Sequence, residues 1–176
     1  MKTKSRTAAE LQRELVEQLN AIKEPASTSD TIATITKWLA SNIDEFGSSA
    51  ETYGLGRFTR LDISSLPIKM MAHNPSEEID AFRRVARHTV DALAMKIRDA
   101  IWTAIVWQTS EQCPNCLNDQ LRALKTARTK RIVLACDFCG WAQTLRGERW
   151  SGGEDLVIMN TEELAAHGML DRMHKN

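Results

Sequence analysis

The sequence lacks both a long apolar run and a net charge. Nothing in its 176 residues approaches the roughly 20 consecutive apolar residues that a transmembrane helix needs, so we expect no membrane partner. Its 23 basic and 23 acidic side chains cancel. A chain without net charge has no overall field to attract DNA, RNA or an anionic membrane.

Recognisable catalytic motifs are also missing. The segment Tyr53-Gly-Leu-Gly-Arg-Phe58 has two glycines but lacks the third glycine or the Gly-Lys-Ser/Thr ending of a phosphate loop. The pair Ser64-Ser65 has no nucleophile elbow, and the four histidines stand in no metal or nucleophile pattern. We therefore expect a protein that is not an enzyme. The alternative is an enzyme whose active-site residues are scattered along the chain.

The N-terminal residues do not have the pattern of a secretory signal. A basic start, Met1 to Arg6, is followed by the polar, helix-forming stretch Ala8 to Arg13 where an apolar segment would be required. We therefore expect a cytoplasmic protein whose cysteines are reduced.

Cysteine is scarce, and its placement is the most informative feature of the chain. The only four cysteines form two CxxC pairs, Cys113/Cys116 and Cys136/Cys139, which are separated by the nineteen residues 117–135. Each CxxC turn can direct two thiolates at one ion, and the intervening stretch is long enough for a β-hairpin. This spacing is typical of a structural zinc site, and no cysteine is left over.

Two other uses of these cysteines can be weighed. A thioredoxin-like redox pair needs one CxxC beside a βαβ unit, and no such pattern surrounds either pair. A rubredoxin-type iron site uses the same four thiolates, so the ligand type does not exclude it. We expect one structural Zn²⁺, because a closed set of four thiolates is the usual structural zinc site.

Residues 112–145 resemble a zinc ribbon, the three-stranded module in which two cysteine turns clamp one zinc ion. The segments Gln120–Lys125, Arg131–Ala135 and Trp141–Leu145 are expected strands, and Gly140 follows the second pair where a positive φ is often needed. The resemblance covers about a fifth of the chain. Zinc ribbons bind nucleic acid, bind proteins or only stabilise a fold, so the resemblance implies a metal without implying a particular function.

The chain before the cysteines reads as helical. Thr7 to Glu10 has the form of a capping box, and Ser29 or Asp30 is an expected start for the second helix. Apolar residues recur at helical spacing in both helices and predict their buried stripes: Leu11, Leu15, Leu19 and Ile22 in the first, and Ile32, Ile35, Leu39, Ile43 and Phe46 in the second. A third helix, begun by the capping box Asn74 to Glu77, carries one continuous apolar stripe and either breaks near His88-Thr89 or forms a long spine. We expect a helical domain over 1–110 with helices at about 7–23, 30–46 and 75–109.

The remainder divides into the zinc ribbon over 111–150 and a C-terminal part over 151–176. Asp155–Met159 reads as a short strand, and Asn160 to Glu163 as the capping box of a short helix that Gly168 weakens. The fold class that we predict is therefore α+β, with a mainly helical N-terminal part, a small β zinc ribbon, and a short C-terminal strand and helix.

Two candidate contact surfaces can be named. Between Asp119 and Arg149, seven basic and three acidic residues leave a local charge of +4, about half of which a four-thiolate site with a divalent ion would neutralise. Arg128, Lys130 and Arg131, at the tip of the expected hairpin, are candidates for contact with phosphates or an acidic partner. Trp102 and Trp107, at the apolar end of the expected long helix, are candidates for a protein interface.

These features predict a binding protein, an accessory subunit in a protein or nucleoprotein complex. The alternatives are a toxin-neutralising or other regulatory inhibitor with a purely structural zinc, and a nucleic-acid-binding regulator. We expect a protein partner or self-association in preference to nucleic acid. The chain has no net charge, and its metal site neutralises part of the local positive charge between Asp119 and Arg149.

Overall fold

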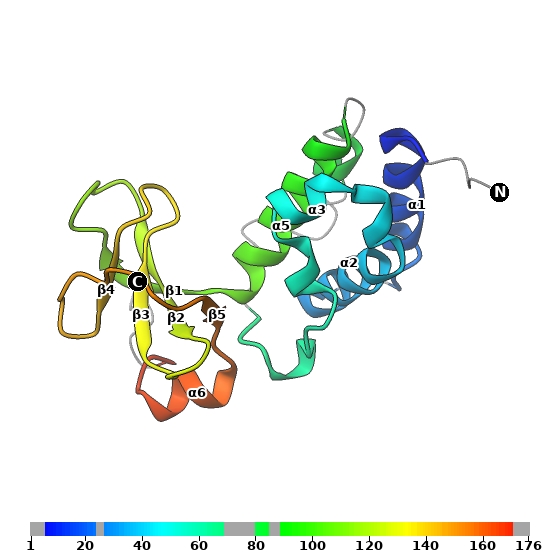
Figure 1. The fold of residues 1–176 in the computed structure, drawn as a ribbon. Helices are drawn as coiled ribbons and strands as arrows, with labels where there is room; N and C mark the ends of the chain where they lie inside the picture. Colours follow the sequence, from blue (N-terminus) through cyan, green and yellow to red (C-terminus); the bar gives the residue numbers. More distant parts are fainter. Residues whose placement is uncertain (1–5, 24–26, 69–79, 85–88, 171–176) are drawn as a thin grey trace. The chain divides into compact units, whose positions relative to one another are not determined.

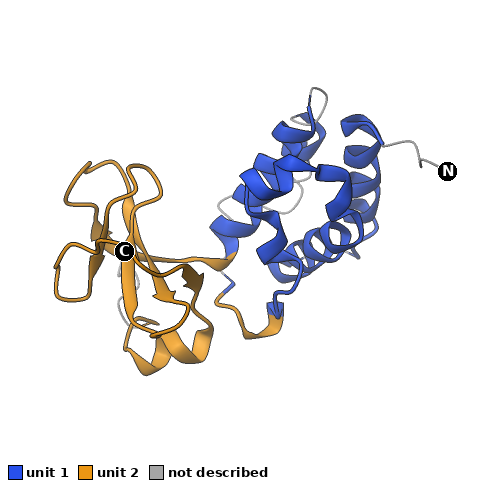
Figure 2. Cartoon of the chain, in the orientation of Figure 1, with its two compact units in different colours: residues 1–63, 68–104 blue, residues 64–67, 105–176 orange. Residues whose placement is uncertain are grey.

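The chain folds into a helical part followed by a small antiparallel sheet and a C-terminal helix (Figure 1). The computed structural model describes residues 6–23, 27–68, 80–84 and 89–170. It divides into two compact units, residues 1–63 with 68–104 and residues 64–67 with 105–176 (Figure 2). The predicted α+β class is confirmed. Within the described ranges, no helix combines the length and apolar character needed to cross a membrane.

The first two helices of unit 1 begin at capping boxes. Helix α1, Ala8–Asn20, has the predicted box, in which the Thr7 hydroxyl accepts from the Glu10 N–H at 3.2 Å and the Glu10 carboxylate accepts from the Thr7 N–H at 2.8 Å. Helix α2, Thr28–Asn42, begins earlier than predicted, because Ser27 is its cap. Asp30 is the third helical residue and accepts from the Ser27 N–H, so it completes the box instead of starting the helix.

The predicted apolar stripes of these helices are buried. They form much of the core of unit 1, where Trp38 meets Phe46 edge to face with 6.0 Å between ring centroids. Helix α2 continues as a 3₁₀ turn, Ile43–Phe46, and Gly47 at φ +50° follows it. The buried members of the two stripes are Leu11, Leu15, Leu19, Ile32, Ile35, Leu39 and Phe46, whereas Ile22 and Ile43 are half-buried.

The segment that the sequence left without clear periodicity holds three short elements. They are helix α3, Ser48–Thr52, and the 3₁₀ turns η2, Leu55–Phe58, and η3, Ile63–Ser65. Leu55 and Phe58 of η2 are fully buried. Isolated apolar residues in turns of three to five residues give no periodic signal, so the sequence pattern alone does not locate these elements.

The predicted helix over 75–109 is wrong at its C-terminal end, whereas the alternative of a break near His88-Thr89 is confirmed at Thr89, which is not helical. Residues 80–84 are helical, and helix α5 runs over Val90–Ile105. Thr89 lies outside α5, and its hydroxyl accepts from the Ala92 N–H at 3.0 Å, so a new helix begins there. The predicted capping box at residues 74–77 lies outside the described residues.

The sheet of unit 2 has five antiparallel strands. Strands β1 to β4 are neighbours in chain order, and β5 pairs with the Leu124–Thr126 end of β2. Asn160 caps helix α6 with the predicted box, and Gly168 beyond it has φ +62°. The elements are β1 Trp107–Gln112, β2 Gln120–Thr126, β3 Ile132–Ala135, β4 Ala142–Thr144, β5 Leu156–Ile158 and α6 Thr161–Ala166.

Strand β1 explains why the long helix does not reach residue 109. Trp107 pairs with Ala123 of β2 and is 7% exposed. It packs in one buried cluster with Leu121, Leu134 and Met159. This burial against the sheet outweighs the helical pattern that the apolar residues continue into this segment.

Replacing Trp107 tests this assignment. We expect Trp107→Ala to lower the free energy of unfolding of the sheet unit by about 3 to 5 kcal/mol, because it removes a large side chain from a packed core. Denaturant titration followed by the amide signals of β2 and β3 measures this loss. The control Trp102→Ala, in α5, should act on the signals of unit 1. A Trp107→Ala protein with unchanged sheet stability would contradict the assignment.

Candidate metal centre

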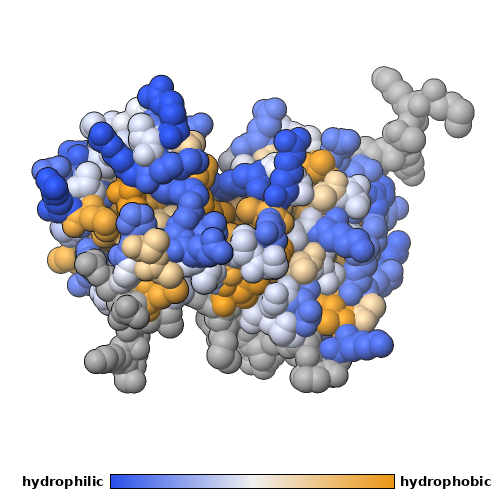
Figure 3. Space-filling view, turned by 90° about the horizontal axis from the view of Figure 1, so that it is seen from below, coloured by the Kyte–Doolittle hydropathy of each residue, from blue (hydrophilic) through white to orange (hydrophobic). Residues whose placement is uncertain are grey.

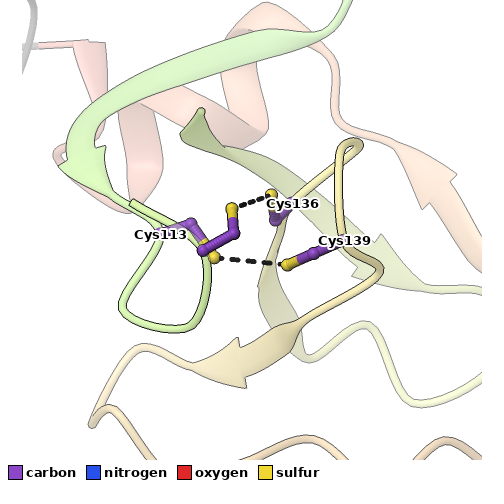
Figure 4. Close-up of side chains that lie close together, drawn as sticks. Cys113, Cys136 and Cys139 are labelled. Atoms are coloured by element: carbon purple, nitrogen blue, oxygen red, sulfur yellow. Dashed lines mark hydrogen bonds between the residues drawn. The ribbon is translucent and has the colours of Figure 1, made fainter. Parts of the chain in front are cut away.

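The two cysteine pairs lie on turns at the same end of the β2–β3 hairpin. Cys113 and Cys116 are in the connection from β1 to β2, and Cys136 and Cys139 are in the connection from β3 to β4. The pairing of β2 with β3 brings the two turns together, and Figure 4 shows side chains from both directed at each other.

The two turns have the same backbone hydrogen bond. The N–H of Leu117 donates to the carbonyl of Cys113, and the N–H of Gly140 donates to the carbonyl of Cys136, each at 3.0 Å. The donor residue has a positive φ in both turns, +57° for Leu117 and +71° for Gly140. The expectation for Gly140 is confirmed. In the first turn a leucine adopts the conformation that favours glycine.

The four sulfur atoms are spaced as ligands of one ion would be. The sulfurs of Cys113 and Cys139 are 3.6 Å apart, those of Cys116 and Cys136 are 3.7 Å apart, and all four lie within 4.8 Å of one another. A tetrahedral ion with metal–sulfur bonds of about 2.3 Å would place its ligands about 3.8 Å apart. The cysteines are free thiols, so the cluster could hold a metal ion.

Burial and hydrogen bonds set the protonation of the second pair. Burial raises the pKa of the Cys136 thiol to about 12, although the N–H groups of Cys139 and Phe138 oppose this. The pKa of Cys139 is lowered to about 6, because the Asn115 amide donates to its sulfur at 3.4 Å and the Trp141 N–H also donates to it. A cation among the sulfurs would offset the cost of ionising the buried thiol.

Arg122 connects the two cysteine turns from β2. Its guanidinium forms ion pairs with Asp119, which follows the first turn, and with Asp137, inside the second. The Arg122 side chain is 13% exposed. Arg122 is one of the basic residues counted in the local excess of positive charge, and its charge is paired within the fold. Lys125 is another, and it pairs with Glu163.

The predicted basic residues lie at the opposite end of the hairpin. Arg128, Lys130 and Arg131 are exposed on the turn between β2 and β3. They stand beside an acidic residue that the sequence analysis did not consider. The Glu154 carboxylate accepts from the N–H groups of Arg128 and Thr129 at 3.1 and 2.9 Å.

The two predicted interface tryptophans are not on one helix. Trp102 is half-buried on α5, with the Arg57 guanidinium 4.3 Å from its ring centroid and Phe58 edge-on at 6.4 Å. Trp107 is in the core of the sheet unit, which accounts for its burial without any partner. The assumption that both residues end the same apolar helix is wrong.

The sequence analysis missed two exposed apolar side chains on the cysteine turns. Leu117 is 63% exposed and Phe138 is 69% exposed. The signal that could have identified them was local: each is a single apolar residue in a short cysteine turn, where the buried positions belong to Cys113 and Cys136. Leu117 also occupies the place that Gly140 has in the second turn.

Comparison with known proteins identifies no relative of the chain. No protein-family model, curated protein or solved structure matches the chain.

The conformation of Leu117 can be tested with two substitutions. Leu117→Ala keeps a Cβ atom at positive φ, whereas Leu117→Gly removes it, and the side chain is exposed in either case. We expect the glycine variant to be more stable than the alanine variant by about 1 kcal/mol, because only alanine retains the left-handed strain. Thermal unfolding of the purified proteins measures the difference. The opposite order would contradict the assigned turn.

Proposed function

We propose that Cys113, Cys116, Cys136 and Cys139 bind one Zn²⁺ ion with a structural role, in a zinc ribbon. The observation that carries this proposal is the arrangement of four thiols at the edge lengths of a tetrahedron, with N–H groups donating to the sulfurs of the second pair. Four protein ligands leave no open coordination position, as in structural and not catalytic zinc sites. Iron would accept the same ligands, and metal analysis separates the two.

The proposed role of the ion is to hold the turns of a small sheet unit. Among its described residues the unit has a modest buried cluster, and each cysteine turn is closed by a backbone hydrogen bond of 3.0 Å. Small units with limited cores commonly obtain part of their folding free energy from a metal.

We further propose that the protein is a binding or accessory subunit of a protein or nucleoprotein complex and not a catalyst. The support comes from Leu117 and Phe138, which expose apolar surface beside the cysteine cluster, one of them in a strained conformation. Exposed aromatic side chains on rigid elements are common anchors in protein interfaces. Apolar residues also reach the surface among hydrophilic ones on the face drawn in Figure 3.

A partner-inhibiting role, such as neutralisation of a toxin, is the second candidate. It would use the same exposed apolar contact, because an inhibitor also acts by binding. The activity of an isolated partner, measured with and without this protein, distinguishes an inhibitor from an accessory subunit.

The metal proposal predicts one zinc ion per chain in protein purified under reducing conditions. Elemental analysis measures zinc and iron together, and stoichiometric iron or no metal would contradict the proposal. Cys136→Ser should lose most of the zinc and the amide signals of the sheet, because three ligands hold the ion weakly. The helical signal in circular dichroism should remain for the most part, since the ligands all lie in unit 2.

The binding proposal predicts that Phe138→Ser weakens capture of the native partner while the zinc content stays unchanged. The reason is that the Phe138 side chain is exposed, so it contributes to binding of the partner and little to the stability of the fold. Leu145→Ser is the matched control, because Leu145 is an exposed apolar residue of the same unit, at 46%, outside the cysteine turns. Affinity purification from the native host, with quantitation of the captured proteins, compares the variants. Equal losses in both would argue against a contact at the cysteine turns.

A further inference from the structure

The turn between β2 and β3 holds a carboxylate through three donors. The N–H groups of Arg128 and Thr129 donate to one oxygen of Glu154, and the Thr129 hydroxyl donates to the other at 2.8 Å. Glu154 is 25 residues further along the chain than Thr129. The contact is therefore a tertiary one between the hairpin turn and the segment that leads into β5.

The turn is built so that these donors face outward. The N–H of Thr126 donates to the Arg131 carbonyl, the N–H of Lys130 donates to the Thr126 carbonyl, and Lys130 has φ +55°. The turn thus closes on itself without using the two amides that contact Glu154. Consecutive N–H groups left free in this way form a nest, a backbone concavity that favours anions.

The nest is open to solvent and has three basic side chains around it, with Asp155 as an acidic neighbour. Arg128, Lys130 and Arg131 are exposed, and within the described part of the chain none of the three has an ion pair. A hollow of about 490 Å³ adjoins the contact, lined by Ala127, Arg128, Gly153, Glu154 and Asp155. The hydrogen bonds from Thr129 hold the pKa of Glu154 below its ordinary value, so the carboxylate is an anion at neutral pH.

The Glu154 side chain can leave the nest without unfolding the sheet. The segment before it contains the exposed Gly152 and Gly153, both at positive φ. The segment after it is fixed separately, because the Asp155 carbonyl accepts from the Ala127 N–H at 2.8 Å. Rotation of one side chain would therefore free all three donors while β5 stays paired with β2.

We infer that this turn is a phosphate-binding site for the backbone of a nucleic-acid strand, and that Glu154 occupies the place of the phosphate in the free protein. A phosphate group offers the nest the same kind of acceptor oxygens with no less charge. Three cationic side chains on one short turn can meet neighbouring phosphates of a polyanion, which a single carboxylate cannot match. The site is separate from the cysteine cluster and extends the proposed function to a nucleic-acid contact.

Removing the internal competitor tests the inference. Glu154→Ala should bind a fluorescently labelled single-stranded oligonucleotide about tenfold more tightly than the unaltered protein, as measured by fluorescence anisotropy at fixed salt. Glu148→Ala is the matched control, because Glu148 is an exposed glutamate of the same unit, so its loss changes the net charge equally. It should change the affinity by about twofold at most. Equal gains in both variants, or none in Glu154→Ala, would overturn the inference.

The location of binding needs its own measurement. In the Glu154→Ala protein, the oligonucleotide should shift the amide NMR signals of Arg128 and Thr129 first, and adding Thr129→Val should remove most of the gain. Glu154→Gln keeps an oxygen acceptor for the turn and should gain a few-fold, which covers the case in which the alanine variant folds poorly. Shifts confined to other residues would overturn the inference.

The source of the phosphate is decided by competing ligands. A phosphoserine peptide and inorganic phosphate are titrated against the same Glu154→Ala protein. Weak binding of both, compared with the oligonucleotide, is the expected result, because each offers only one phosphate to the turn. A phosphopeptide that binds as tightly as the oligonucleotide would overturn the assignment to nucleic acid.

Discussion

The sheet unit is organised around four sulfur atoms that the pairing of β2 with β3 brings together at one end of the hairpin. Pairs of thiols from different turns approach to 3.6 and 3.7 Å, and their thiolates could not share this space without a counter-charge. The fold supplies part of it through backbone N–H groups and the Asn115 amide. A bound cation would supply the rest, and both cysteine turns would then be held by one centre.

This constraint organises the β2–β3 hairpin into two chemically different ends. At the cysteine end, Arg122 on β2 joins Asp119 and Asp137, so positive charge is enclosed and paired. At the turn end, the cationic side chains stay exposed and an acidic residue from a later segment occupies the backbone amides. One hairpin thereby has paired, largely buried charge at one end and exposed cationic side chains at the other.

The local signals in the sequence predicted much of the fold because they act over a few residues. The capping boxes at Thr7 and Asn160 need only a side chain and an amide three positions apart. The stripes of α1 and α2 follow from the period of the helix. The cysteine cluster was predicted from the spacing within each CxxC pair and from an intervening segment long enough for a β-hairpin, which β2 and β3 form.

The sequence by itself therefore determined the class of the fold, the caps, the apolar faces and the set of clustered cysteines. The tertiary structure decided the conformation of those residues whose sequence pattern and packing environment favour different structures. Trp107 continues a helical pattern but joins the sheet because its ring is buried there. Leu117 and Phe138 are exposed because the inward positions of the two turns are occupied by Cys113 and Cys136. Glu154 reaches the hairpin turn only because β5 pairs with β2, a long-range contact that no local spacing encodes.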